Sequence, residues 1–401
     1  MSEKIIILLI IFSFLSLTIK INNYTIESII NRYNNRFKGK NISFKNIEDN
    51  MVNYISYAKW IKECKVNEIA FKKNFANPKI SLIASVFNKE KYLKHFIKSI
   101  QMQDLKEIEA VFVDDFSNDN SVKIINNFRK KDKRIKLIKN KKNMGSLYSR
   151  AIGGNMAKGN YCIFFDSDDI ILKEGILKAY NHIIKYKLDI VQFLSIIHRN
   201  ETIFTTKNMF KYKKIIRQPL LSHIFYYDKE GVENNIYLWD KLITKQVVLK
   251  SLKYIGKKYI HQRIILENDV ILLFAFFKIA ESYQFIEYFG YYYFRSNSGS
   301  ITNSKTEPKK SNQLIHSILT NIQFLYEKTS NTFLDKYYCA YKYRQFFKRY
   351  KEILINSKKE FNYMKDLSNI LLESKYISNK DKLAILKIYL TIFNIDGSIR
   401  E

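Results

Sequence analysis

From Pro78 onwards, short runs rich in β-branched residues alternate with longer amphipathic stretches. The short runs have the length and composition of strands, and the longer stretches show the apolar spacing of helices. The sequence predicts strands at 80–86, 110–113, 135–138, 161–165 and 190–194, and helices at 91–103, 121–130, 146–158 and 175–187. Strands that alternate with helices form a mostly parallel sheet, because parallel neighbours need a crossover connection. The predicted fold class is therefore α/β.

The segments on either side of this region have a helical pattern instead. Apolar residues recur at helical spacing beyond residue 304, which predicts a helical C-terminal region at 304–401. Residues 22–77 are more polar and predict a helical stem, preceded by a separate apolar segment at 1–21. The α/β domain is expected to span 78–303.

The apolar segment at the N-terminus runs from Ile5 to Ile19, between Lys4 and Lys20. As a helix it is about 22 Å long, short of the roughly 30 Å hydrocarbon core of a membrane. This length favours a signal peptide, but no small-x-small cleavage pattern follows, so an uncleaved membrane anchor stays open. We expect a protein of the secretory pathway or of a membrane, in an orientation that the sequence leaves open.

The net charge and the cysteines of the chain bear on which partners it binds and which kinds of site it can contain. The formal net charge is +30, which is compatible with a surface that binds a polyanion or an anionic membrane. The lysines are dispersed through every segment, however, so we favour a solvated basic surface and do not expect nucleic acid as a partner. Three cysteines without a CxxC pattern exclude a disulfide scaffold and a cysteine-based zinc ribbon.

Ligands of an open α/β sheet bind outside the carboxyl ends of its strands. The first predicted strand is followed by Phe87 and Asn88 without glycine, which excludes a dinucleotide fingerprint and a phosphate-binding Walker A loop. The second is followed by Asp114 and Asp115, whose carboxylates are suited to accept hydrogen bonds from a ribose or a base.

Three carboxylates in four residues, Asp166, Asp168 and Asp169, follow the fourth predicted strand. Such carboxylates repel one another unless a cation or solvent compensates their charge. One of them could cap the next helix, but a cap uses one carboxylate rather than three. In a turn, positions i and i+2 can converge on one hard divalent ion such as Mg²⁺, so we predict a metal site here.

Seven stretches, taken in order, resemble the family 2 glycosyltransferases, whose catalytic domain has the GT-A fold with a Rossmann-like sheet. Any one stretch is a weak signal, whereas their shared order is specific. The resemblance covers a little over half of the chain, from Pro78 to about Ile301. The stretches are VFN at 86–88, DDFSNDNS at 114–121, NMGSLYSRAIGGNMAKGNY at 143–161, FFDSDD at 164–169, WDKLI at 239–243, ENDVILLF at 267–274 and YYYFRSNSGSIT at 291–302.

The resemblance implies a nucleotide-sugar donor bound across the ends of these strands. Asn88 and Asp114 would lie beside the base and the ribose, and Asp115 would hold the loop. Arg150 and Asp166 would face the diphosphate, although an exposed helical arginine is an alternative for Arg150.

The metal and the catalytic base are also implied by the resemblance. Asp166 and Asp168 form the DxD pair, which would bind Mn²⁺ or Mg²⁺ across the donor diphosphate, with Asp169 as an alternative ligand or a supporting residue. The base comes from a late acidic pair, which is interrupted by one residue in this chain. Its spacing favours Asp269 and leaves Glu267 as a competing candidate.

The implied reaction is an inverting transfer of a sugar, by default from a UDP-sugar, to a glycan, protein or lipid acceptor. Trp239 is expected either to stack on the acceptor sugar or to belong to the core. Arg295 and Ser300 are expected to close over the donor phosphates. The interrupted acidic pair leaves a second hypothesis, a catalytically silent relative that binds a sugar nucleotide or a polyanion.

Overall fold

The computed structural model describes residues 71, 75–199, 202–205, 214–218, 220–221, 237–265, 267–294 and 308–328. The expected N-terminal segment, Arg295, Ser300, and most of the expected stem and C-terminal region therefore lie outside the described residues. In the part that is described, no helix has both the length and the apolar character needed to cross a membrane.

Ten strands and eight helices make up the described part of the chain. The strands are β1 (Ile80–Val86), β2 (Ile108–Asp114), β3 (Ile135–Lys139), β4 (Tyr161–Asp166), β5 (Ile170–Ile171), β6 (Ile190–Arg199), β7 (Thr202–Thr205), β8 (Ile216–Arg217), β9 (Lys241–Thr244) and β10 (Ser282–Phe294). The helices are α4 (Glu90–Gln101), α5 (Ser121–Lys131), α6 (Ser146–Met156), α7 (Gly175–Tyr186), α9 (Lys245–Ile255), α10 (Lys257–Ile260), α11 (Asn268–Ile279) and α12 (Pro308–Lys328).

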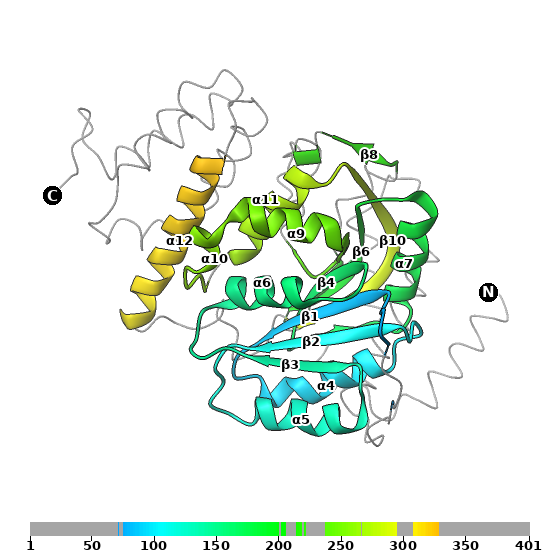
Figure 1. Cartoon of the computed structure of the whole chain (residues 1–401), viewed down its shortest axis with the longest axis horizontal. Helices are drawn as coiled ribbons and strands as arrows, with labels where there is room; N and C mark the ends of the chain where they lie inside the picture. The colour runs from blue at the N-terminus through cyan, green and yellow to red at the C-terminus, as the bar shows by residue number, and fades with distance from the viewer. Residues whose placement is uncertain are drawn as a thin grey trace.

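All described strands belong to one mixed sheet with the order β3-β2-β1-β4-β9-β6-β10-β5, to which β7 and β8 are added by pairing with β6 and β10 (Figure 1). β1 pairs in parallel with β2 and β4, β2 with β3, and β6 with β10. The short strand β9 lies antiparallel between β4 and β6. The five strands and four helices predicted before residue 200 are present; the bounds of β1 agree with the prediction, and those of the other elements are shifted by a few residues.

Helices cover both faces of the sheet, with α4 and α5 below it and α6 above it in Figure 1. Along β1, Ile83 packs into the apolar cluster beneath α6, α9 and α11, whereas Leu82 and Ala84 pack into the cluster beneath α4, α5 and α7. Side chains alternate between the faces of a strand, and both faces are buried here. This explains why the strands read as nearly continuous apolar runs.

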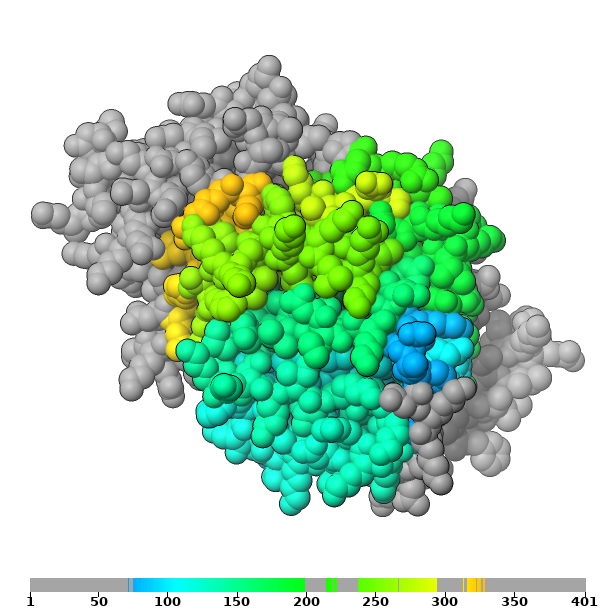
Figure 2. Space-filling model, viewed as in Figure 1, coloured from blue at the N-terminus to red at the C-terminus, as the bar shows by residue number. Residues whose placement is uncertain are grey.

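Helix α11 is enclosed on all sides. Every residue from Val270 to Phe277 is buried, as expected of a helix that is apolar all round. It packs against α9 and α12, and in the space-filling view α12, in orange and yellow, lies directly against the yellow-green helices (Figure 2). Full burial of one phenylalanine such as Phe274 contributes about 1.5–3 kcal/mol. This packing fixes the start of α11, where Asp269 lies.

The first turns of α4 and α5 are joined by reciprocal hydrogen bonds. The Asp119 carboxylate accepts from the backbone N–H groups of Ser121 (2.9 Å) and Glu90 (3.0 Å), the first residues of the two helices. In return, Glu90 Oε2 accepts from the backbone N–H of Asn120 at 2.9 Å. Helix N-termini carry N–H groups without intrahelical partners, and these contacts satisfy several of them. The ends of β1 and β2 are thereby held at a fixed spacing.

Candidate functional site

The loops after β1 and β2 place Asn88 and Asp114 side by side. Val86 and Asp114 are register partners, so the two loops leave the sheet together. Asn88 has a left-handed backbone (φ 52°), a conformation that asparagine tolerates better than most residues. Its N–H donates to Ser117 Oγ at 3.0 Å, and its Oδ1 accepts from the N–H of Asn118 at 3.0 Å. The Asp114 carboxylate accepts from the N–H of Ser117 at 3.3 Å.

Asp115 is buried and uses its carboxylate inside the protein. Oδ1 accepts from Asn140 Nδ2 and from the N–H of Met144, and Oδ2 accepts from the N–H of Gly145, each at 2.8 Å. These are the contacts of a residue that fixes the loop leading into α6. Because Arg150 lies on α6, Asp115 indirectly sets the position of that arginine.

Gly145 → Ala should destabilise the protein more than Gly256 → Ala does. Both glycines have positive φ (87° and 81°), so the strain of about 1–3 kcal/mol for a side chain in that region is shared. A Cβ at Gly145 would lie 2.8 Å from the Ile264 carbonyl oxygen, whereas at Gly256 it meets nothing within 4 Å. We expect an extra loss of about 1–3 kcal/mol for Gly145 → Ala in urea unfolding. Equal losses would show that this contact relaxes freely.

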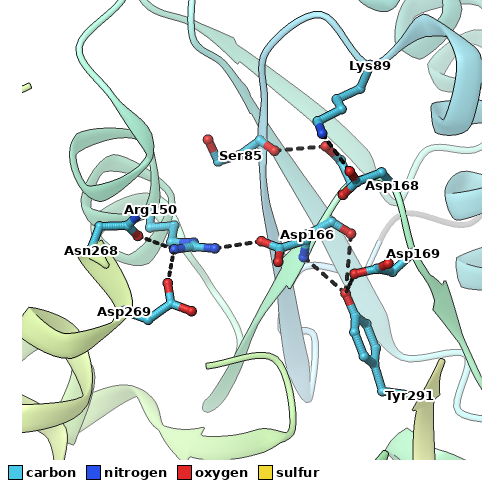
Figure 3. A network of polar contacts seen from close by, with 10 residues as sticks. Ser85, Lys89, Arg150, Asp166, Asp168, Asp169, Asn268, Asp269 and Tyr291 are labelled. Carbon is cyan, nitrogen blue, oxygen red and sulfur yellow. Dashed lines mark hydrogen bonds and ion pairs between the residues drawn. The ribbon is translucent and has the colours of Figure 1, made fainter. Parts of the chain in front are cut away.

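Each of the three carboxylates after β4 has its own partner from a different element (Figure 3). Asp166 Oδ1 lies 2.6 Å from Arg150 on α6, and Asp168 Oδ2 lies 2.6 Å from the Lys89 ammonium just before α4. Asp169 Oδ2 accepts from the Tyr291 hydroxyl of β10 at 2.7 Å. The repulsion that the sequence implied is therefore relieved by two protein cations and a phenol.

Burial and neighbouring charges shift the pKa values of Asp166 and Lys89 in this cluster. Burial raises the pKa of Asp166 to about 6; the Arg150 guanidinium opposes this rise, and the carboxylates of Asp269 and Asp168 add to it. Burial lowers the pKa of Lys89, but the neighbouring carboxylates, with Asp168 foremost, outweigh it and the net pKa is raised. The Lys89 ammonium therefore keeps its proton.

Arg150 connects the end of β4 to the start of α11. Its side chain is only 5% exposed, so the alternative of an exposed helical arginine is wrong. The guanidinium contacts Asp166 Oδ1 at 2.6 Å and Asp269 Oδ1 at 2.5 Å, and it donates a further hydrogen bond to Asn268 Oδ1. A planar guanidinium suits such multiple contacts, because its donors have a fixed geometry. One buried cation thus holds two carboxylates that are far apart in the sequence.

The two candidates for the base occupy different positions. Asp269 lies in the first turn of α11 with 24% of its side chain exposed, and it reaches the same guanidinium as Asp166. Glu267 precedes the helix with a left-handed backbone (φ 55°). The structure therefore brings Asp269 to the end of β4 through Arg150.

Trp239 belongs to the core. It is 2% exposed, and its ring stacks on Tyr237 at 4.6 Å and on Tyr291 at 4.7 Å between centroids. Next to it, Asp240 and Lys241 form a fully buried ion pair at 2.5 Å. Trp239 was expected either to stack on the acceptor sugar or to belong to the core, and the structure shows the second.

The sequence analysis missed Lys89 and Tyr291. Lys89 directly follows Asn88 at the end of the first predicted strand, and this position could have identified it. Tyr291 begins an aromatic run, but nothing in that run separates it from its neighbours. Its hydroxyl also accepts from the N–H of Asp166 at 3.3 Å, so it contacts the carboxylate turn at two points.

Asp166 and Asp168 have the chemistry of ligands for a divalent ion. Among the described residues no group of three or more His, Cys, Asp or Glu side chains is arranged to hold a metal. The two aspartates nevertheless each use a single carboxylate oxygen for the ion pair with Arg150 or Lys89. Mg²⁺ commonly takes one or two carboxylates and completes its shell with water and substrate phosphate. The two aspartates therefore fit such an ion. Arg150 and Lys89 would compete with the ion for the two carboxylates.

Comparison with known proteins identifies what this arrangement resembles. Residues 81–235 match the model of the family described as "Glycosyl transferase family 2". The chain is 26% identical over 350 residues to a cholesterol galactosyltransferase of Borreliella burgdorferi, covering 80% of this chain and 94% of that protein. It is 41% identical over 111 residues to an uncharacterized glycosyltransferase of Haemophilus influenzae, a match over 28% of this chain and 44% of that protein.

Among solved structures, S. aureus TarS residues 1–349 in complex with UDP superpose with a TM-score of 0.56 at 18% identity. The superposition covers 78% of this chain and 87% of that one. The same TarS fragment has also been solved with UDP-GlcNAc. At this identity the likeness shows the fold alone, a mixed α/β architecture with a central sheet.

Proposed function

We propose that this chain, whose residues 81–235 match the family 2 glycosyltransferase model, transfers a sugar from a nucleoside diphosphate to an acceptor hydroxyl with inversion. The observation that carries the proposal is the bridge formed by Arg150. It brings Asp166, at the end of β4, and Asp269, at the start of α11, to one guanidinium at 2.6 and 2.5 Å. Direct displacement needs the base and the group that holds the leaving diphosphate close to one reacting carbon, and Arg150 brings the two carboxylates together.

In the proposed reaction, the acceptor oxygen attacks the anomeric carbon while the bond from that carbon to the diphosphate oxygen breaks. Asp269 accepts the proton of the acceptor hydroxyl, and Arg150 orients the Asp269 carboxylate. Asn88 and Asp114 bind the nucleoside at the ends of β1 and β2. A divalent Mn²⁺ or Mg²⁺ ion held by Asp166 and Asp168 would supply positive charge for the leaving diphosphate.

The comparisons support a donor and an acceptor class. TarS has been solved with UDP and with UDP-GlcNAc, which supports a UDP-sugar as the donor. The match to the cholesterol galactosyltransferase covers most of both proteins, which supports a lipid hydroxyl among the acceptor classes. A membrane-bound acceptor would also agree with the apolar N-terminal segment that the sequence predicts.

UDP should bind to the full chain in a Mn²⁺-dependent manner, and the double substitution Asp166 → Ala/Asp168 → Ala should abolish that dependence. The reason is that the two carboxylates would hold the ion against the diphosphate. Calorimetric titration of UDP with and without Mn²⁺ measures the effect, and circular dichroism checks that both proteins are folded. The proposal fails if the folded wild type binds none of UDP, GDP, CMP and dTDP.

A further inference from the structure

Lys89 places a positive charge directly on one member of the DxD pair. Its ammonium lies 2.6 Å from Asp168 Oδ2, and the two side chains are 21% and 13% exposed. A solvent-exposed pair of this kind contributes little, but a pair with both partners mostly buried is screened much less. Water therefore screens the attraction between Lys89 and Asp168 only weakly.

The backbone around Lys89 fixes where this ammonium can reach. The left-handed conformation of Asn88 turns the chain at the end of β1. The N–H of Lys89 then donates to Ser121 Oγ at 2.8 Å, and its carbonyl accepts from the N–H of Leu93 at 2.9 Å in the first turn of α4. Both backbone polar groups of Lys89 are hydrogen-bonded. The backbone of Lys89 is therefore held in place beside the carboxylate turn.

The position of Lys89 conflicts with simple metal binding at Asp168. A divalent ion and the ammonium would share the same carboxylate, and two cations so close together repel each other. A nucleoside diphosphate changes this balance, because its negative oxygens offer the ammonium a second partner. The ion and the diphosphate should then bind more tightly together than either binds alone, which is a coupling between two ligands.

We propose that Lys89 is a resident counter-ion of the DxD pair, which keeps divalent ions weakly bound until a nucleoside diphosphate arrives. The inference rests on the proposed function, in which Asp166 and Asp168 hold the ion with the donor. Lys89 acts through Asp168 and is in this sense a positioning residue. Its effect is that the enzyme takes up metal and donor as a pair.

The test measures Mn²⁺ binding to the full chain without nucleotide, from the electron paramagnetic resonance signal of free Mn²⁺. Lys89 → Met should tighten Mn²⁺ binding about tenfold or more, since it removes a cation beside a ligand. Lys89 → Arg keeps the charge and should leave binding as weak as in the wild type. Lys91 → Met is the matched control: Lys91 is an exposed lysine on the first turn of α4, and its removal should change nothing.

A second measurement adds UDP. In the wild type UDP should tighten Mn²⁺ binding strongly, and in Lys89 → Met this gain should shrink, because the competing charge is already gone. The combination Lys89 → Met with Asp166 → Ala/Asp168 → Ala should lose the gained Mn²⁺ site.

Unchanged or weaker Mn²⁺ binding in a folded Lys89 → Met protein would overturn the inference. If UDP binding to the wild type is then still Mn²⁺-dependent, the proposed function stands and only the role of Lys89 fails. If neither protein binds Mn²⁺ with or without UDP, both the role of Lys89 and the metal dependence are wrong. A merely structural lysine would lower stability in Lys89 → Met without tightening Mn²⁺ binding.

Discussion

Replacement of Asp269 by Asn should lower kcat for sugar transfer by about 10²–10⁴-fold, the usual contribution of a general base. The amide has the same shape and keeps an oxygen for the contact with Arg150, but it cannot accept the proton of the acceptor hydroxyl. Because Asp269 is not among the residues proposed to bind the donor, the affinity for UDP should stay close to that of the wild type. Steady-state transfer assays and calorimetric titration of UDP measure the two effects separately.

Glu267 → Gln is the matched control, since it makes the same chemical change two residues earlier in the chain. We expect a much smaller loss of kcat, because Asp269 is the residue that Arg150 brings to the end of β4. A large loss in Glu267 → Gln with a small one in Asp269 → Asn would make Glu267 the base. Small losses in both would contradict catalysis by this acidic segment.

Arg150 → Met should destabilise the fold by about 3 kcal/mol and abolish transfer. Removal of one partner from a buried ion pair leaves the other without compensation, which typically costs about 3–5 kcal/mol. We expect the lower end, because the side chains of Asp166 and Asp269 remain 34% and 24% exposed to water. Urea unfolding measures the stability, and the transfer assay measures the activity.

Arg129 → Met provides the comparison for that experiment. Arg129 is exposed on α5, so its loss should stay within about 0.5 kcal/mol of the wild type. Similar stabilities for the two variants would mean that water replaces the Arg150 guanidinium without cost. Arg150 → Lys separates charge from shape, because an ammonium cannot span both carboxylates in the fixed geometry of a guanidinium.

The sequence predicted the first half of the sheet well, because those strands are apolar on both faces and follow helices with clear periodicity. The bounds of β1 agree residue for residue with the prediction. Strand β9 was missed because it has four residues and begins with Lys241, whose charge hides its burial. Only the structure shows that Asp240 neutralises this lysine inside the protein.

The candidate site was predictable where it depends on local sequence and not where it depends on the order of strands. Asp114 and Asp166 end β2 and β4, which identifies them as residues of the carboxyl edge. The partners come from far along the chain: Arg150 pairs with Asp269 over 119 residues, and Tyr291 bonds Asp169 over 122. The first contact depends on the packing of α11 against α6, and the second on the pairing of β10 with β5; the sequence carries no local signal for either.

The aromatic stack beside the carboxylate turn gives this protein an optical property. Trp239 is one of two tryptophans in the chain, the other being Trp60. Its ring lies on Tyr291, whose hydroxyl is bonded to Asp169 and to the backbone of Asp166. Tryptophan fluorescence responds to its immediate surroundings, so the emission of Trp239 monitors this turn without an attached dye. A Trp60 → Phe protein would carry a single tryptophan, at the base of the site.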